Sequence, residues 1–324
     1  MCSWEFTCSD VQRRGPGYDS PVLRDLVLGI ANSKAIRSAV TGGLGRKVAL
    51  RFVAGETLDD AITAVAALNA DGFDVSLDHL GENISDVAQA DSATQMYLAA
   101  IDRIEGGNLR ANVSVKLTQL GLDLDEGLAT AGAHAIVARA ASVGTSVTLD
   151  MEDHRYTDRT IDACIALSRR FPHAIGVAVQ TYLHRTPEDL ERLIEARVHV
   201  RLCKGAYKEP RTIAFRSRVE VDAAYARLAT RLIESPAYAM IATHDEALID
   251  HAIAEIERTK RDPATHEFQM LYGVRRELQR SLLARGYRLR VYVPFGSQWY
   301  PYLMRRIAER PANMRFFAEA LARG

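Results

Sequence analysis

Short apolar runs alternate with amphipathic segments of helix length along most of the chain, from residue 57 onward. The runs are nearly continuous in β-branched and other apolar residues, which is typical of parallel strands buried on both faces. They cover residues 73–81, 112–119, 146–152, 175–182, 199–207, 239–245, 267–273 and 289–294. Eight strand–helix units in about 240 residues predict a closed (β/α)8 barrel. A doubly wound open sheet is the alternative, but it usually contains a phosphate-binding fingerprint, which is absent here.

The segments between the runs contain helix start and stop signals. Thr57 and Asp60 predict a capping box at the start of the first helix, which ends at Asp71-Gly72. Thr186 is predicted to be an N-cap, with Pro187 as the first helical residue. Apolar residues at helical spacing predict three buried stripes. They are Leu190, Leu193 and Ile194; Leu248, Ile249, Ala252, Ile253 and Ile256; and Leu278, Leu282 and Leu283.

The two ends of the chain differ from this repeating pattern. Residues 1–45 are irregular and rich in turn residues, so we expect an N-terminal leader or helical arm before a single barrel domain over 46–324. The glycine-rich segment 41–47 matches neither common phosphate-binding spacing and predicts a flexible turn. Residues 297–311 predict a helix, because Pro301 falls in the first turn, where proline is tolerated. This helix follows the last strand, and we expect it to fold over the barrel mouth.

Composition narrows the classes of function. The 41 basic and 41 acidic residues give no net charge, and no dense basic run is present, so we expect no nucleic-acid partner. No stretch approaches the roughly 20 apolar residues of a membrane span, and the N-terminus lacks the pattern of a secretory signal. Four scattered cysteines, Cys2, Cys8, Cys164 and Cys203, form no disulfide framework. These features predict a cytoplasmic protein, with Cys164 and Cys203 as buried thiols.

Polar residues lie near the carboxyl end of every predicted strand, where barrels of this class build their active sites. They are Asp78 and His79, Lys116, Asp150, Gln180, Lys204 to Tyr207, Thr243 to Asp245, Gln269 and Tyr292. A single polar residue at such a position usually anchors a loop. Polar residues at the ends of all eight strands together predict a polar cavity. Packing them in an apolar interior is unfavourable, because burying unpaired charges such as Lys116 and Asp150 would cost several kcal/mol.

The predicted last helix has a charged face. Tyr302, Arg305, Arg306 and Glu309 are spaced i, i+3, i+4 and i+7 and therefore share one side. On an arbitrary helix this would be a solvated Arg/Glu face. After the eighth strand, however, two adjacent guanidinium groups predict a carboxylate clamp, which Glu309 can orient.

Other chemistries fit the sequence less well. The nine histidines include no closely spaced pair typical of zinc ligands, so no metal site is expected. A Schiff-base aldolase would need Lys116 or Lys204 to be neutral, whereas both have anionic neighbours that would keep them charged. No GxSxG motif of a serine hydrolase is present.

Four ordered motifs resemble the proline dehydrogenase family in its monofunctional bacterial form. They are RFVAGET (51–57), RLCKGAYKEP (201–210), EFQMLYGVR (267–275) and YVPFGSQWYPYLMRRIAERPAN (292–313), within a resemblance that covers nearly all of residues 48–320. The resemblance implies FAD at the carboxyl end of the barrel. It also implies hydride transfer from C5 of L-proline to give Δ1-pyrroline-5-carboxylate, the first step of proline catabolism to glutamate.

The resemblance also implies roles for individual residues. Lys116, Arg305 and Arg306 are expected to hold the proline carboxylate, with Glu309 orienting the arginines. Tyr207, Leu271, Tyr292 and Tyr302 are expected to enclose the ring, and Asp150 to bond toward Tyr292. Arg201 is expected near the redox face of the flavin, where its charge stabilises the anionic reduced form. The expected FAD contacts are Gln180, Arg201, Lys204, Gly205, Thr243 and His244.

Substrate and electron acceptor follow from the same resemblance. Tyr302 crowds C4 of the ring and favours proline over hydroxyproline, so hydroxyproline dehydrogenase is the alternative enzyme. A non-catalytic barrel that senses flavin or an amino acid is the alternative outside the enzymes. Membrane quinone is the expected acceptor, with peripheral contact at the inner face of the cell membrane. A separate pyrroline-5-carboxylate dehydrogenase is expected to oxidise the product.

Overall fold

The structure, a computed structural model, describes residues 50–81 and 84–308, without the side chains of 305–308. By contacts the chain divides into two compact units. One is Arg51–Ser297, and the other combines Met1–Leu50 with Gln298–Gly324. Of the second unit, the described part is Leu50, Gln298 and the helix α12, Trp299–Ala308.

The unit Arg51–Ser297 is a closed parallel barrel in which each strand pairs with its neighbours in sequence and β8 pairs with β1. Its strands are β1 Asp74–His79, β2 Ala111–Val115, β3 Val147–Leu149, β4 Ile175–Gln180, β5 His199–Cys203, β6 Ala239–Ala242, β7 His266–Leu271 and β8 Leu289–Phe295. Every strand lies within or beside the run that predicted it, so the predicted (β/α)8 barrel is confirmed and the open sheet is excluded.

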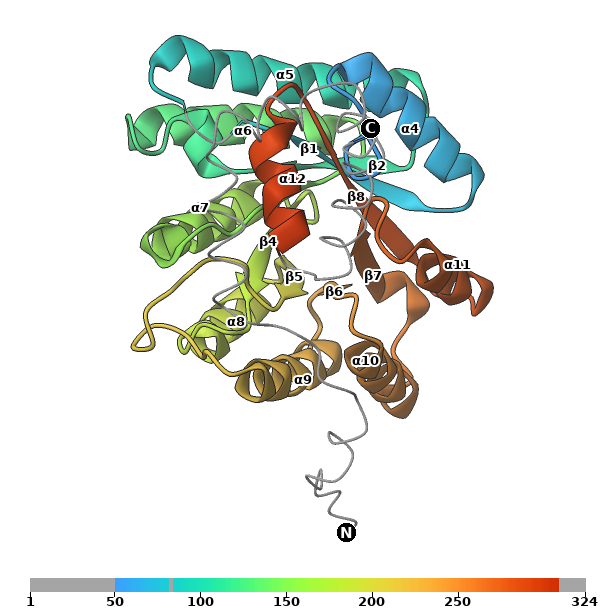
Figure 1. The fold of residues 1–324 in the computed structure, drawn as a ribbon. Coiled ribbons are helices and arrows are strands. Elements are labelled where there is room, and N and C mark those ends of the chain that lie inside the picture. The colour runs from blue at the N-terminus through green and yellow to red at the C-terminus, as the bar shows by residue number, and fades with distance from the viewer. Residues whose placement is uncertain (1–49, 82–83, 309–324) are drawn as a thin grey trace, which may run out of the picture. The chain divides into compact units, whose positions relative to one another are not determined.

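Helices surround the barrel (Figure 1). They are α4 Leu58–Ala70, α5 Val87–Gly106, α6 Glu126–Ser142, α7 Thr157–Arg170, α8 Thr186–Glu195, α9 Arg218–Glu234, α10 Glu246–Thr259 and α11 Arg276–Ala284. Short 3-10 turns are η2 Leu117–Leu120, η3 His154–Tyr156 and η4 Pro263–Thr265. Since α4 precedes β1 and contacts both β1 and β8, it occupies the eighth outer position within this unit.

The predicted helix starts were right in one case and wrong in another. Thr57 caps α4, and the capping box with Asp60 is present. Thr186 is instead the first residue of α8, and Arg185 occupies the N-cap. The physical reason is a competing partner, because the Thr186 hydroxyl donates to the Gln180 carbonyl at 2.6 Å. The α8 and α10 stripes are buried as predicted; in α11, Leu282 is buried and Leu278 and Leu283 are half-buried.

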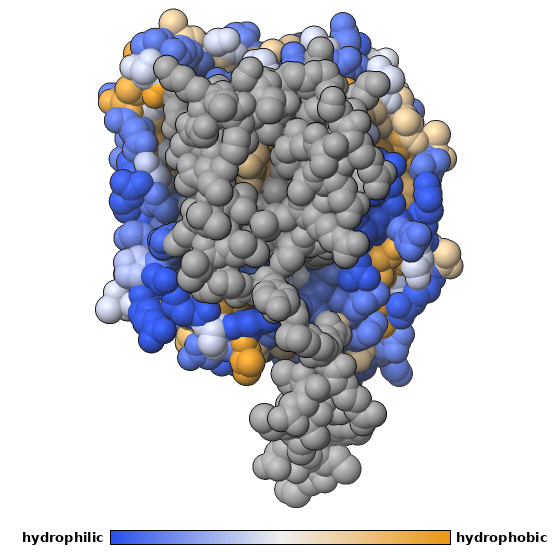
Figure 2. Space-filling model, viewed as in Figure 1, coloured by the Kyte–Doolittle hydropathy of each residue, from blue (hydrophilic) through white to orange (hydrophobic). Residues whose placement is uncertain are grey.

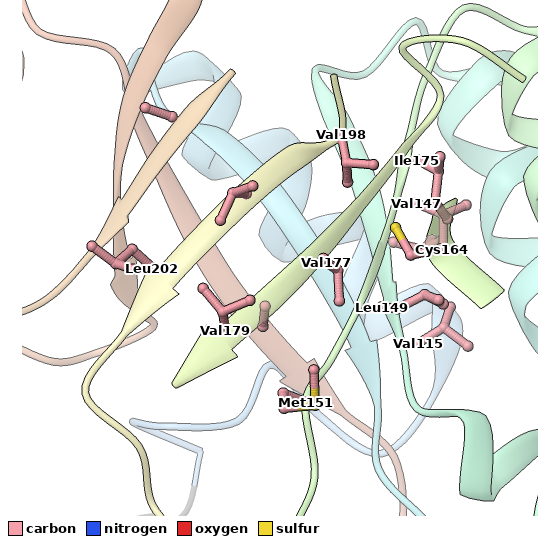
Figure 3. Packing of buried hydrophobic residues seen from close by; sticks show 14 of the residues in the cluster. Val115, Val147, Leu149, Met151, Cys164, Ile175, Val177, Val179, Val198 and Leu202 are labelled. Atoms are coloured by element: carbon pink, nitrogen blue, oxygen red, sulfur yellow. The ribbon is translucent and has the colours of Figure 1, made fainter. Parts of the chain in front are cut away.

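The hydrophobic core lies between the strands and the outer helices. Figure 3 shows part of it, with Cys164 of α7 beside Val147 and Ile175 and with further residues of β2 to β5. Cys164 is fully buried, and this burial raises the pKa of its thiol. Cys203 was predicted to be buried but is half-buried, and desolvation raises the pKa of its thiol to about 12, so both thiols are protonated at neutral pH. Cys2 and Cys8 lie outside the described residues.

The outer surface of the described residues is mainly hydrophilic in the view of Figure 2, with scattered hydrophobic residues. In the part of the chain that the structure describes, no helix combines the length and the apolar character needed to cross a bilayer.

One glycine is required by a close approach of two backbone segments. Gly273 follows β7 with φ +73°, and a Cβ there would lie 1.8 Å from the Arg51 carbonyl oxygen. Gly144, also at φ +73°, has nothing within 4 Å of the position where a Cβ would stand. An alanine would therefore have the same backbone strain at both sites, but only at Gly273 would its Cβ overlap another atom.

We expect Gly144→Ala to reduce the free energy of unfolding by about 1 kcal/mol, the cost of a left-handed conformation for alanine. Gly273→Ala should reduce it by roughly 3 kcal/mol, because the backbone must also move away from Arg51. Thermal and denaturant unfolding of both variants measures the difference. Equal losses would contradict the close approach.

Candidate active site

The interior of the barrel is polar. Alternate residues of each strand point inward, and many of these positions hold polar or charged side chains. Ser76 and Asp78 of β1, Ser114 of β2 with the following Lys116, and Arg201 of β5 are all buried. Period-two alternation along each strand brings these side chains together inside the barrel.

Asp150, directly after β3, is the centre of this cluster. Its Oδ1 accepts hydrogen bonds from Ser114 Oγ at 2.7 Å and Arg201 Nη1 at 2.5 Å. Its Oδ2 accepts from Tyr292 Oη at 2.6 Å and from Lys116 Nζ at 3.3 Å. Burial alone would raise the pKa of Asp150, but Lys116 and Arg201 lower it below its ordinary value. The carboxylate is therefore ionised at neutral pH.

Lys116 is shared by two carboxylates. Its Nζ lies 2.8 Å from Asp78 Oδ1 in addition to its contact with Asp150. Burial would lower the pKa of Lys116, but the charges of Asp78 and its other neighbours raise it well above the ordinary value. Burial also raises the pKa of Asp78 to about 6, against the opposing effect of Lys116. Lys116 thus remains a fixed cation, as expected from its anionic neighbours, and this excludes it as a neutral Schiff-base lysine.

Arg201 connects opposite sides of the barrel. Its Nε donates to Gln269 Oε1 at 2.6 Å, Nη1 donates to Ser114 and Asp150, and Nη2 lies 3.3 Å from Ser76 Oγ. Its guanidinium also lies over the ring of Tyr292, 5.3 Å from the centroid. Burial and Asp150 raise the pKa of Tyr292 well above its ordinary value, so Tyr292 remains a neutral donor.

A second charged layer lies nearer the amino ends of the strands. Arg290 of β8 forms a two-pronged bond with the buried Glu267 of β7, at 2.7 and 3.1 Å. Gln269 donates to Glu267 and accepts from Arg201, so it joins the two layers. Burial would raise the pKa of Glu267, but Arg290 lowers it, and the pair is therefore ionised.

The residues expected to contact FAD lie at the same carboxyl ends. The Gln180 amide donates to the Glu152 carbonyl at 2.8 Å. Lys204 forms ion pairs with Asp222 and Asp245. Thr243 Oγ1 accepts from the Asp245 amide at 3.1 Å. Gly205 has φ +116°, and a Cβ there would overlap the ring of Tyr182.

Two other expected residues meet at the end of β7. The ring Nε2 of His244 accepts the backbone N–H of Leu271 at 2.9 Å, which fixes the proton of that imidazole on Nδ1.

Tyr207 is half-buried in the segment that follows β5. Tyr302 is a buried residue of α12, whereas the side chains of Arg305 and Arg306 are not described. Glu309 lies outside the described residues.

Asp78 and Gln269 were predicted at strand ends without a role, and Ser114, Glu267 and Arg290 were not predicted. A signal for all three was available. Ser114 lies two residues before Lys116, Glu267 two before Gln269, and Arg290 two before Tyr292. Because side chains alternate along a strand, each must point to the same interior as its partner.

These features define a (β/α)8-barrel enzyme whose centre holds fixed cations at the carboxyl ends of its strands. Among the described residues no cluster of His, Cys, Asp and Glu could hold a metal ion. The charged side chains of this centre are fixed by one another, so the centre is pre-arranged for a small polar ligand.

Comparison with known proteins gives the family. Residues 61–319 match the family described as proline dehydrogenase. The sequence is 36% identical to proline dehydrogenase 1 of Bacillus subtilis (strain 168) over 93% of this chain and 99% of the relative. It is 39% identical to the proline dehydrogenase of Deinococcus radiodurans, over 86% and 91%. The chain belongs to the proline dehydrogenase family, and it is an FAD-dependent enzyme that oxidises L-proline.

Solved structures support the fold. The crystal structure of proline utilization A (PutA) from Bdellovibrio bacteriovorus, inactivated by N-propargylglycine, matches with a TM-score of 0.77 and 23% identity. The match covers 86% of this chain and 35% of that one, so the present chain spans about a third of the larger protein.

We expect Lys116→Met to lower the free energy of unfolding by about 4 kcal/mol at pH 8, because two buried carboxylates lose their shared cation. The loss should be smaller at pH 5. The pKa of Asp78 is raised from 3.8 to about 6, so it already binds a proton there, and one of the two negative charges is absent. Unfolding of both proteins at the two pH values tests this, and an equal loss at both would contradict it.

Proposed function

We propose that L-proline is oxidised at the polar carboxyl end of the barrel, with its carboxylate held by Lys116, Arg305 and Arg306. The observation that carries this proposal is the buried Lys116, a permanent cation between Asp78 and Asp150. A cation held in place by two carboxylates needs no reorganisation when an anionic group arrives. In the sequence, Arg305 and Arg306 share a helix face with Tyr302 and Glu309, which we propose to act at the same site.

We propose that Tyr207, Leu271, Tyr292 and Tyr302 enclose the proline ring. Tyr292 is held in place by its bond to Asp150 and by the guanidinium of Arg201, so it offers a fixed wall. Neither carboxylate of the described cluster is free to act as a base, since Asp150 accepts four hydrogen bonds and Asp78 is paired with Lys116. The chain then acts mainly by positioning, with proline reacting through its neutral amine, and by keeping water from the reacting carbon.

The donors near the strand ends fit FAD. Gln180, Arg201, Lys204, Thr243 and His244 supply amide, cationic and polar groups at consecutive strand ends, and Gly205, whose missing side chain leaves room for the Tyr182 ring, lies among them. FAD, when bound, supplies the acceptor for the hydride that leaves proline C5. Arg201 is the candidate for holding a positive charge beside it, because its guanidinium is fixed by four side chains.

We also propose the cellular setting and the domain organisation. Electrons pass on to a membrane quinone during peripheral contact with the inner face of the cell membrane, and the enzyme is otherwise cytoplasmic. A separate dehydrogenase oxidises the pyrroline-5-carboxylate product. We propose that residues 1–45 form an N-terminal leader or arm and that residues 46–324 form the catalytic barrel. Hydroxyproline is the alternative substrate, which Tyr302 disfavours by crowding C4 of the ring.

The direct test is the visible absorption spectrum of the purified protein before and after anaerobic addition of L-proline. We expect a flavin spectrum that bleaches with proline and far less with hydroxyproline. Bleaching with hydroxyproline to the same extent would assign the alternative substrate. A flavin spectrum that neither compound changes would favour a sensor, and a protein that binds no FAD would overturn the proposal.

Arg305→Met and Arg306→Met test the carboxylate clamp. Each should raise the KM for proline by about 30-fold or more, because a charge-assisted bond to a carboxylate contributes roughly 2 kcal/mol or more. The ratio of flavin to protein should stay at the wild-type value. A wild-type KM in either variant would remove that arginine from the clamp.

A further inference from the structure

Residues 204–217 form the long loop between β5 and α9, which we call the excursion. It contains several of the proposed substrate and cofactor residues. Its two ends are tied to the segment that follows β4 by backbone hydrogen bonds. Tyr182 donates to the Lys204 carbonyl at 3.0 Å, His184 donates to Ile213 at 3.0 Å, and Phe215 donates to Tyr182 at 2.8 Å. Leu183 and Ala214 form an isolated antiparallel bridge. These bonds fix the start and the return of the excursion.

The middle of the excursion is held on its other side by Glu209. The Glu209 carboxylate crosses to the segment that follows β3. There Oε1 accepts the backbone N–H of His154 at 2.9 Å, and Oε2 lies 2.5 Å from His154 Nδ1. A carboxylate accepts only, so Nδ1 carries the proton in this contact. Arg216 also donates to the Glu209 carbonyl, which closes the excursion on itself.

The Glu209 carboxylate is buried, so its free energy depends on keeping its hydrogen-bond donors. The Glu209 side chain is 3% exposed and that of His154 is 36% exposed. A buried carboxylate that loses a hydrogen-bond donor costs free energy, so the excursion moves if His154 cannot donate. Tyr207 lies two residues before Glu209, and any shift at Glu209 is passed to it along the chain.

We propose that His154 and Glu209 are positioning residues that fix the position of Tyr207 relative to the proline ring. The proposal rests on the proposed function, in which Tyr207 is part of the wall around that ring. Neither residue need touch proline. They act through the backbone of residues 207–209, by joining the segment after β3, which begins at Asp150, to the segment after β5.

A pair of substitutions at one position tests the proposal. In His154→Leu the donor to Glu209 Oε2 is lost, and we expect the KM for proline to rise about tenfold with kcat changed less than about threefold. His154→Asn keeps an N–H donor near the position of Nδ1 and should return the KM to within about threefold of wild type. Because His154 is partly exposed, both variants should fold, and thermal unfolding with the flavin-to-protein ratio checks this.

Glu209→Met tests the pair from the other side, since it removes the oxygens that accept from His154 and supplies no group that could donate to Nδ1 instead. We expect its KM to rise as in His154→Leu, and the double variant to be no worse than either single one, because one contact is lost in all three. Arg231→Gln is the matched control. It removes an exposed ion pair with Glu191 between α9 and α8 and should leave the KM unchanged.

Three outcomes would overturn the proposal. They are a wild-type KM in His154→Leu, equal impairment in His154→Leu and His154→Asn, and additive effects in the double variant. Failure of the proposed function is distinguishable, because the wild-type flavin would then remain oxidised when L-proline is added.

Discussion

One buried negative charge, that of Asp150, constrains much of the barrel interior. Its four donors come from three other strands or their ends, β2, β5 and β8. Removing one member of such a group leaves an uncompensated charge, which costs more than an ordinary lost contact. A shift by one residue in any of these strands would turn its donor out of the barrel. The cluster therefore helps to fix the register of the sheet as well as the shape of the candidate active site.

A polar interior is possible here because the barrel does not depend on it for hydrophobic stabilisation. The apolar core lies outside the strands, under the ring of helices, where Val113, Leu149, Val177 and their neighbours are fully buried. The interior can then be filled by paired charges in layers. Glu267 with Arg290 closes the amino end, and Gln269 links that layer to Arg201. Lys116, nearer the carboxyl end, is held between Asp78 and Asp150.

The fold could be predicted from the sequence because both of its periodicities are local. The runs of apolar residues and the helical stripes alone gave all eight strands. The candidate site was predicted as positions, such as Lys116 and Asp150 at strand ends, but not as a network. Ser114 and Asp78 acquire their roles only when the pairing of β1, β2 and β3 brings their side chains together. Thr186 illustrates the same limit, since its hydroxyl was expected to cap α8 and instead meets the Gln180 carbonyl.

Beyond the strand ends the barrel ladder stops. Backbone bonds still join the segments that follow β4 and β5, and side chains make further connections between neighbouring segments. The contacts run in order around the mouth. Thr118, after β2, donates to Glu152 after β3, and Gln180 of β4 donates to the Glu152 carbonyl. His154 then reaches Glu209 after β5, past the segment that follows β4. Each contact joins segments that are far apart in sequence, and none extends a strand ladder. Residues on such segments, Tyr207 among them, can be held as accurately as those on strands only where partners of this kind are present.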